Sequence, residues 1–236
     1  LAFNAPQLNR QHHYDAVADN QLRSFAHVDL LDQDLSEPTD KSVLVNPHDP
    51  SADQNLRARS YLHTNCAHCH RMHAGSSVLS KMQFDLELPK TTMLNERPSQ
   101  GTFSIPTARV IAPGDPYRSV LYYRMSKLGR GRMPHIGSTM VDDAGVELIY
   151  DWISQLPATT DSESPATATD DLLAAVKKTD AGSEEQTVAV TQLLATTTGA
   201  LRALRAVQQS SLDETVRRNI IEQALAHSDS QVRDLF

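Results

Sequence analysis

The sequence predicts a mainly α-helical protein: a larger helical domain with a short β insertion, followed by a small all-helical unit. Helix-start signals recur along the chain, at Asp115-Pro116, Ser183-x-x-Gln186 and Ser211-x-x-Glu214. Apolar residues spaced three and four apart follow these signals, whereas period-two alternation is noted in one short stretch. Helices should therefore form most of the regular structure.

Composition limits the classes of protein that are possible. Hydrophobic residues make up 39% and charged residues 22% of the 236-residue chain, enough apolar material for real cores. No run of 18 apolar residues occurs, so no transmembrane segment is expected. The formal net charge of −7 argues against a nucleic-acid-binding surface.

Charge is spread unevenly over the chain. Residues 1–50 carry a balance of −5, residues 51–157 a balance of +3, and residues 158–236 a balance of −5. A basic middle between acidic flanks can steer a partner or attract the flanking segments, and ordinary solvated surface explains it equally well.

Four segments differ in character. Residues 1–50 are polar and form an N-terminal extension that we expect to pack on the next domain, with a short helix around Gln21–Leu31. Residues 51–157 carry most motifs. Residues 158–169 are rich in Ser, Thr, Ala and Pro and read as a linker, and residues 170–236 form the helical unit.

The motif-bearing segment opens with a predicted helix over Asp53–His63 that leads into a pair of cysteines. Met82–Leu88 and Thr107–Ala112 are candidate strands, because apolar residues alternate or β-branched residues gather there. Asp115-Pro116 then opens a helix over Tyr117–Lys127, which should stop at Gly129.

One more helix closes this segment. It begins near Asp142–Asp143, whose charges suit the positive end of the helix dipole, and it ends before Pro157. Val146, Ile149 and Trp152 share one apolar face.

Three helices are predicted in the C-terminal unit, over Glu184–Ala195, Thr198–Gln208 and Leu212–His227. Each of the two capping boxes begins with a serine, and these serines, Ser183 and Ser211, precede the first and the third of the helices. Helices of this size fit a fragment of a helical-repeat array or a simple small bundle.

The only two cysteines lie in the string Cys66-Ala-His-Cys69-His70. Cys-x-x-Cys-His is the attachment signature of c-type haem. Residues three apart on a helical turn share a face, so both thiols can reach the two vinyl groups of one porphyrin edge. His70 then becomes the proximal iron ligand, and one covalent haem c is the expected cofactor.

Two other interpretations compete with haem attachment. A redox-active dithiol usually lies where strands and helices alternate, which the predicted elements do not provide. A zinc site needs four ligands, and His63, His68, His73 and His135 do not complete a recognised spacing with the cysteines.

An electron-transfer haem needs a second axial ligand, and Met133 is the best candidate. It precedes Pro134 on a glycine- and arginine-rich loop just before the last helix of the segment. His135 is the next candidate and Met140 a reserve, whereas Met125 fits the core of a helix. Ligation by His and Met raises the reduction potential, which suits an electron carrier.

The order of helix, Cys-x-x-Cys-His, Met-Pro loop and aromatic-bearing last helix resembles class I c-type cytochromes. More narrowly, the chain resembles the cytochrome modules of large planctomycetal haem-binding polypeptides. The matching strings are Arg59-Ser-Tyr-Leu-His-Thr-Asn-Cys-Ala-His-Cys-His, Phe84-Asp-Leu, Ile111-Ala-Pro-Gly-Asp-Pro, Gly131-Arg-Met-Pro-His-Ile-Gly and Leu148-Ile-Tyr-Asp-Trp-Ile.

The resemblance implies a cytochrome c-like haem domain over residues 51–157. It implies thioether anchors at Cys66 and Cys69, with His70 and Met133 as the two iron ligands. It further implies a periplasmic or otherwise extracytoplasmic location. The expected partner is a redox protein or an adjacent dehydrogenase or cytochrome domain.

Two functional classes remain open. In the first, the chain is no enzyme but a module that passes single electrons. In the second, it is a haem enzyme or gas-binding sensor whose distal position is open or labile. Arg71, Arg130 and Arg132 either surround the exposed haem edge and meet an acidic partner or the haem propionates, or are solvated surface residues.

Overall fold

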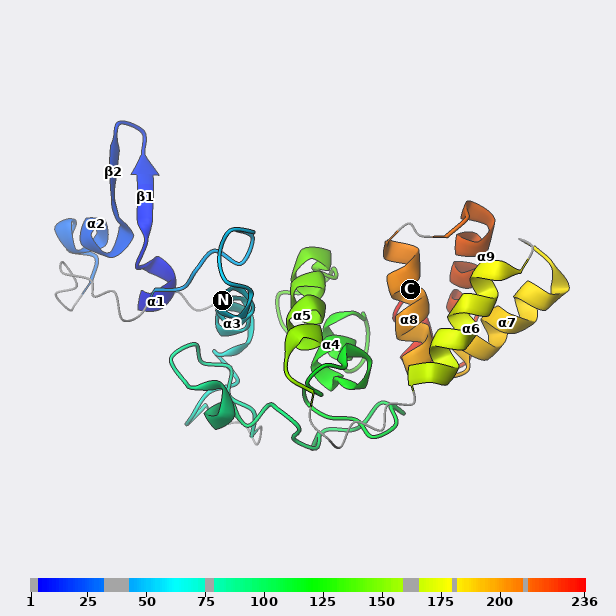
Figure 1. Ribbon diagram of the computed structural model, residues 1–236. Coiled ribbons are helices and arrows are strands. Elements are labelled where there is room, and N and C mark those ends of the chain that lie inside the picture. The colour runs from blue at the N-terminus through cyan, green and yellow to red at the C-terminus, as the bar shows by residue number, and fades with distance from the viewer. Residues whose placement is uncertain (1–3, 32–42, 75–78, 159–165, 180–181, 210–211) are drawn as a thin grey trace. The chain divides into compact units, whose positions relative to one another are not determined.

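The computed structural model describes residues 4–31, 43–74, 79–158, 166–179, 182–209 and 212–236 (Figure 1). This part of the chain is mainly helical, as predicted. It divides into two compact units, Leu1–Thr92 and Met93–Phe236, each of which is described by itself. The boundary falls inside residues 51–157, the segment that the sequence suggests is a single domain.

A small hairpin opens the first unit. After the short helix α1 (Ala5–Leu8), strands β1 (Gln11–Tyr14) and β2 (Val17–Asn20) pair antiparallel across a tight turn at Asp15, whose φ of 48° an aspartate tolerates. The hairpin was not predicted, because β1 is fully exposed and has no alternating apolar face.

The predicted helix around Gln21–Leu31 is present but shorter. Helix α2 spans Gln21–His27, and the side chain of Asn20 caps it by accepting from the Leu22 amide.

Helix α3 (Gln54–Cys66) confirms the helix that leads into the cysteine motif and extends it by three residues. The Asp53 carboxylate caps it by accepting from the Leu56 amide at 2.9 Å. Ala58 and Leu62 are fully buried. The helix therefore fixes the position of the first cysteine from a packed core.

Residues 43–50 lie along this helix. The Val45 amide donates to the Ser60 hydroxyl at 3.1 Å, and Arg57 Nε donates to the Pro47 carbonyl at 2.9 Å. Both bonds give backbone groups of an irregular segment a partner on α3.

The predicted strand over Met82–Leu88 is wrong. The segment is irregular and ends in the short 3₁₀ helix η2 (Leu88–Thr91). Met82 is buried while Asp85 and Glu87 are exposed, so the alternation is real. Several of its carbonyls bond the Arg59 guanidinium instead of a neighbouring strand.

The second predicted strand is also wrong. Within Thr107–Ala112 the backbone makes only isolated parallel bridges, Leu94 to Ile111 and Arg109 to Ser119. Among the described residues, the predicted β insertion is therefore absent, and the one sheet is the N-terminal hairpin of β1 and β2.

The helix predicted over Tyr117–Lys127 begins as expected but breaks. Asp115 caps the 3₁₀ helix η3 (Pro116–Arg118), and α4 (Val120–Met125) follows. Ser119 lies between them in an extended conformation, because the flanking Arg118 carbonyl and Val120 amide bond Arg109. Pairing with a distant residue overrides the local helix signal here.

Helix α5 (Asp143–Gln155) confirms the predicted last helix of the segment. Asp142 caps it through a 3.0 Å bond from the Gly145 amide. Ile149, Trp152 and Ile153 are buried on the predicted apolar face.

The C-terminal helices are α6 (Ala166–Lys178), α7 (Glu184–Leu194), α8 (Thr197–Gln208), α9 (Glu214–Leu225) and the short α10 (Ser230–Arg233). The three predicted helices are confirmed within two residues at each end. Much of the predicted linker 158–169 lies outside the described residues, but its last four residues begin α6.

The two predicted capping residues have different outcomes. The Ser183 hydroxyl accepts from the Gln186 amide at 3.1 Å and caps α7 as predicted. Ser211 lies outside the described residues, and the residue that caps α9 is Asp213, which accepts from the Thr215 amide.

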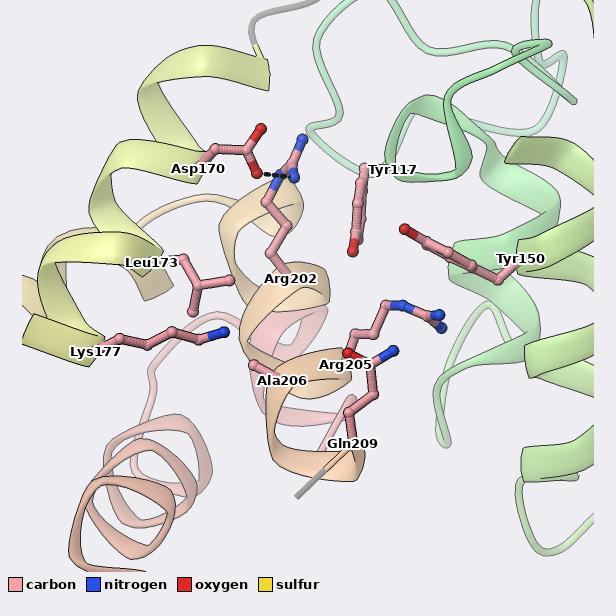
Figure 2. A pocket seen from close by; sticks show the side chains of 9 residues that line it. All are labelled: Tyr117, Tyr150, Asp170, Leu173, Lys177, Arg202, Arg205, Ala206 and Gln209. Carbon is pink, nitrogen blue, oxygen red and sulfur yellow. Dashed lines mark hydrogen bonds and ion pairs between the residues drawn. The ribbon is translucent and has the colours of Figure 1, made fainter. Parts of the chain in front are cut away.

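Helix α8 joins the C-terminal helices to the preceding part of the same unit. Arg202 and Arg205 project from α8 beside Tyr117 of η3 and Tyr150 of α5 (Figure 2). The guanidinium carbon lies 4.1 Å from the ring centre of Tyr117 in the first pair and 3.4 Å from that of Tyr150 in the second. Arg205 also pairs with Glu147 on α5.

Gly199 shows how closely α8 is approached by its neighbour. A Cβ atom at this position would lie 1.9 Å from the Leu193 carbonyl oxygen, so only glycine fits.

Among the described residues, none of the helices combines the length and the apolar character that a membrane crossing requires.

We expect Ile153→Ala to lower the free energy of unfolding by about 2–5 kcal/mol, because the side chain is fully buried and its loss leaves a cavity. Urea denaturation followed by circular dichroism measures this. The control is Ser154→Ala at the next residue, which lies on the exposed face of α5 and should change stability by less than about 0.5 kcal/mol. Equal effects of the two substitutions would contradict this packing.

Candidate haem-attachment site

The cysteine motif continues the helix as one further turn. Cys66 is the last residue of α3, and its carbonyl accepts from the amides of Cys69 at 3.1 Å and His70 at 2.8 Å. The predicted helical spacing of the two cysteines is therefore present in the backbone. Neither cysteine is in a disulfide.

Burial raises the pKa of the Cys66 thiol to about 12, and the neighbouring Cys69 thiol adds to this effect. Cys66 is thus protonated at neutral pH. A redox-active dithiol needs a nucleophilic thiolate with a lowered pKa, so this environment does not favour that interpretation. A sulfur that ends as a thioether has no such requirement.

His70 is oriented through one of its two ring nitrogens. Its Nδ1 lies 3.1 Å from the hydroxyl and 3.3 Å from the carbonyl oxygen of Ser80. A carbonyl only accepts, so this contact favours the tautomer with the proton on Nδ1. The lone pair that can bind a metal is then on Nε2, the usual arrangement of a histidine ligand.

The segment that carries Ser80 is tied to the motif. The Met82 amide donates to the His70 carbonyl at 2.8 Å, and the Lys81 amide donates to the Thr91 carbonyl at 2.7 Å. Ser80 is itself buried. The backbone directly after Ser80, the partner of the His70 ring, is therefore held by two hydrogen bonds.

Two residues of α3 hold the continuation of this segment. The Arg59 guanidinium donates to the carbonyls of Gln83, Phe84 and Leu86 and lies 5.6 Å from the centre of the Phe84 ring. The Phe84 amide donates to Nδ1 of His63 at 2.9 Å. Burial lowers the pKa of His63, and this keeps the ring neutral and able to accept.

These contacts identify residues that the motif alone does not. Ser80 could not be predicted from the sequence, because a single serine before a lysine belongs to no recognised motif. Arg59 and Phe84 are within the strings that carry the family resemblance, and their pairing across 25 residues is visible only in the structure.

The described residues do not bring together the ligands that a zinc site requires. Within the described ranges, no three His, Cys, Asp or Glu side chains are grouped so that they could hold a metal ion. His63, one of the histidines considered as a ligand, accepts from a backbone amide instead.

Met133 belongs to the second compact unit, on a loop over residues 129–140. Its amide donates to the Arg124 carbonyl at 3.0 Å, and Arg124 Nε donates to the Gly131 carbonyl at 2.7 Å. Its side chain is half-buried. Two bonds to the end of α4 thus brace the backbone on either side of Arg132.

The other candidate side chains lie in different surroundings. Met125 is buried in the core as predicted, whereas Met140 and Met72 are exposed. His135, the second choice for a distal ligand, is also exposed.

Arg132 is not a surface residue, in contrast to the prediction for the three arginines near the iron ligands. It is only 8% exposed, and its guanidinium bonds the carbonyls of Lys127 and Met140 and the Ser138 hydroxyl. Its role is to close the loop that carries Met133. Arg71 and Arg130 are exposed, so a docking role remains open to them.

An open hollow of about 340 Å³ lies in the second unit, where α8 faces α6 (Figure 2). Its arginines are already paired, Arg202 with Asp170 and Arg205 with Glu147. Burial and the neighbouring Tyr150 raise the pKa of Tyr117, so that ring stays neutral. The charges of the two arginines are thus balanced by the protein itself, and Lys177 also lines the hollow.

No protein-family model, curated protein or solved structure matches the chain. The resemblance to planctomycetal cytochrome modules therefore stays a prediction from the motifs.

The lowered pKa of His63 gives a pH dependence. The unfolded chain takes up the His63 proton near its ordinary pKa of 6.5 and the folded chain only at lower pH, so stability should fall as the pH drops below about 6.5. His63→Asn retains an acceptor but does not titrate, and should lose less stability between pH 7.5 and 5 in urea titrations. Exposed His48→Asn is the control and should follow the wild type; parallel curves for all three would contradict the assignment.

Proposed function

We propose that this chain is a monohaem c-type cytochrome module that transfers single electrons. The observation that carries the proposal is the Cys-x-x-Cys-His turn at the end of α3, whose histidine is oriented through Nδ1 by Ser80. Attachment signature and ligand tautomer are independent features, and both are required for a covalently bound, histidine-ligated haem.

The residues of the motif suit distinct roles. Cys66 and Cys69 provide the two sulfurs for thioether bonds, and Nε2 of His70 provides the proximal nitrogen. Haem c, when bound, supplies a one-electron iron couple. The Ser80 carbonyl then acts on that couple through His70, since a hydrogen bond at Nδ1 makes the opposite nitrogen a stronger donor.

We assign the second axial position to Met133. It is the half-buried methionine on a braced loop, whereas the other methionines that we considered are either core residues or exposed side chains. The bonds from Arg124 and Arg132 restrict the loop backbone, as a ligand that must stay in place in both redox states requires.

The polar groups beside the motif support a carrier rather than a catalyst. His63 accepts from the Phe84 amide, and the Arg59 guanidinium is engaged by backbone carbonyls. General acid–base chemistry needs titratable groups aimed at a substrate, and these two are instead used to hold a loop.

The proposal extends to location and partner. Haem is attached to such motifs outside the cytoplasm, so we place the module in the periplasm or an equivalent compartment. The partner is a redox protein or a neighbouring dehydrogenase or cytochrome domain, and exposed Arg71 and Arg130 can meet acidic groups on it.

The first test is covalent attachment. Produced in a host that matures c-type cytochromes, the chain should be coloured, give a haem c pyridine haemochrome spectrum, and keep haem after denaturation. The double variant Cys66→Ala, Cys69→Ala should lose the denaturation-resistant haem, because no other cysteine can form a thioether. A colourless wild type with the mass of the bare polypeptide would end the proposal.

The second test concerns the distal ligand. Met133→Ala should retain covalent haem but lose the methionine–iron charge-transfer absorption and lower the reduction potential, since methionine ligation raises it. Met140→Ala is a matched control on the same loop, with a side chain that is 79% exposed, and should keep the band and the potential. A band that survives Met133→Ala would assign the position to another residue.

A further inference from the structure

The C-terminal end of the chain contacts the base of the Met133 loop within the second unit. Asp234 follows α10, and its backbone carbonyl accepts from the Leu128 amide at 2.8 Å. Its carboxylate accepts from Lys127 Nζ at 3.3 Å. One residue near the end of the chain thus bonds two consecutive residues that lead into the loop.

Lys127 is buried, with a side chain only 2% exposed. Its ammonium group donates to the Arg130 carbonyl at 2.9 Å and lies 5.3 Å from the centre of the Tyr123 ring. A buried ammonium needs such partners because it has lost its water. Asp234 is the carboxylate that balances its charge.

Gly129 permits this close approach. Its φ is +67°, and a Cβ atom there would lie 2.5 Å from an oxygen of the Asp234 carboxylate. Another residue would push the carboxylate away from Lys127, so the backbone conformation and the ion pair depend on the same glycine.

The contact reaches Met133 through a short chain of bonds. The Lys127 carbonyl accepts from the Arg132 guanidinium, which also bonds the Met140 carbonyl and so spans the loop. A second tie lies nearby, where the Tyr123 hydroxyl donates to the Gln231 carbonyl at 3.0 Å. The loop is therefore held at its base by α10 and the residues after it.

We infer that Asp234 is a positioning residue, which through Lys127 fixes the Met133 loop and thereby sets how readily Met133 leaves the iron. The inference rests on the proposed function, in which Met133 is the distal ligand. It gives the C-terminal helices a role in tuning the haem site.

The mechanism is the cost of an unbalanced buried charge. Without the Asp234 carboxylate, the Lys127 ammonium can regain solvation only by moving outward, and the Arg130 carbonyl moves with it. The open form of the loop then becomes more populated. An added ligand that competes with Met133 binds only that form, so its apparent affinity reports the population directly.

The experiment uses the full chain with haem attached and compares Asp234→Asn with Glu214→Gln. The Glu214→Gln substitution also removes one carboxylate from an ion pair of the C-terminal helices, but that pair, with Arg217, is exposed and lies within α9. Imidazole titration of the oxidised protein should show about tenfold tighter apparent binding in Asp234→Asn, given the partial burial of the pair. Glu214→Gln should match the wild type, and Asp234→Glu should restore most of the difference.

Hydrogen exchange adds a readout that does not depend on the iron. Amides of residues 128–140 should exchange faster in Asp234→Asn and at wild-type rates in Glu214→Gln. Faster exchange without tighter imidazole binding would overturn the inference, because the loop would then open without releasing the ligand.

The outcomes separate the inference from the proposal beneath it. If the wild type lacks the methionine–iron band, the assignment of Met133 fails and the inference fails with it. If the band is present but Asp234→Asn and Glu214→Gln bind imidazole alike, only the inference fails.

Should Asp234→Asn not fold, Tyr123→Phe tests the second tie between the C-terminal residues and the base of the loop. It keeps the ring beside Lys127 and removes only the bond to the Gln231 carbonyl. Imidazole affinity should rise in the same direction by a smaller factor, about threefold. An unchanged affinity in a folded Tyr123→Phe protein would count against the inference.

Discussion

The hydrogen bond between His70 and Ser80 is the constraint around which the first unit is arranged. This bond can orient the ring only if the acceptor at Nδ1 is itself held in place. Ser80 lies on an irregular segment, so regular backbone structure does not hold it. The bonds from Met82 to the motif and from Arg59 to the segment supply that rigidity. Residues far from the cysteines in the sequence thus determine which nitrogen of the histidine can meet a metal.

The second unit solves a related problem by different means. The Met133 loop, residues 129–140, carries glycines and one proline and has little regular structure to hold it. Arg124 and Arg132 bond backbone carbonyls across the loop, and the C-terminal residues close its base. In both units, arginines within the fold bond carbonyls that no strand pairs. Guanidinium groups are suited to this because several donors lie in one plane.

Helices could be predicted from the sequence wherever their signals are local. The caps of α3, α5 and α7 are adjacent to the helices that they start. Ser183 was predicted as a cap, whereas Asp53 and Asp142 were predicted only as residues near which a helix begins. The strand predictions failed because alternation of apolar residues indicates that one side of a segment is buried, but not that a neighbouring strand is present to pair with it. In Met82–Leu88 the alternation is genuine, but Arg59 takes the place of the ladder.

The site shows the same division. The proposed roles of Cys66, Cys69 and His70 rest on their spacing in the sequence, and the turn that this spacing requires is present. Ser80 and Asp234 could not be found, since each acts through a contact with a residue distant in sequence or with a backbone group. Arg132 was misplaced on the surface because charge alone favours exposure, whereas its guanidinium satisfies two carbonyls inside a loop.

The stacking of Arg202 and Arg205 on Tyr117 and Tyr150 bears on how such a chain can be divided or recombined. A truncation after α5 would strip two aromatic rings of their cover and leave Glu147 without its cation. Met93–Phe236 should therefore be kept together as one unit when the chain is divided or recombined.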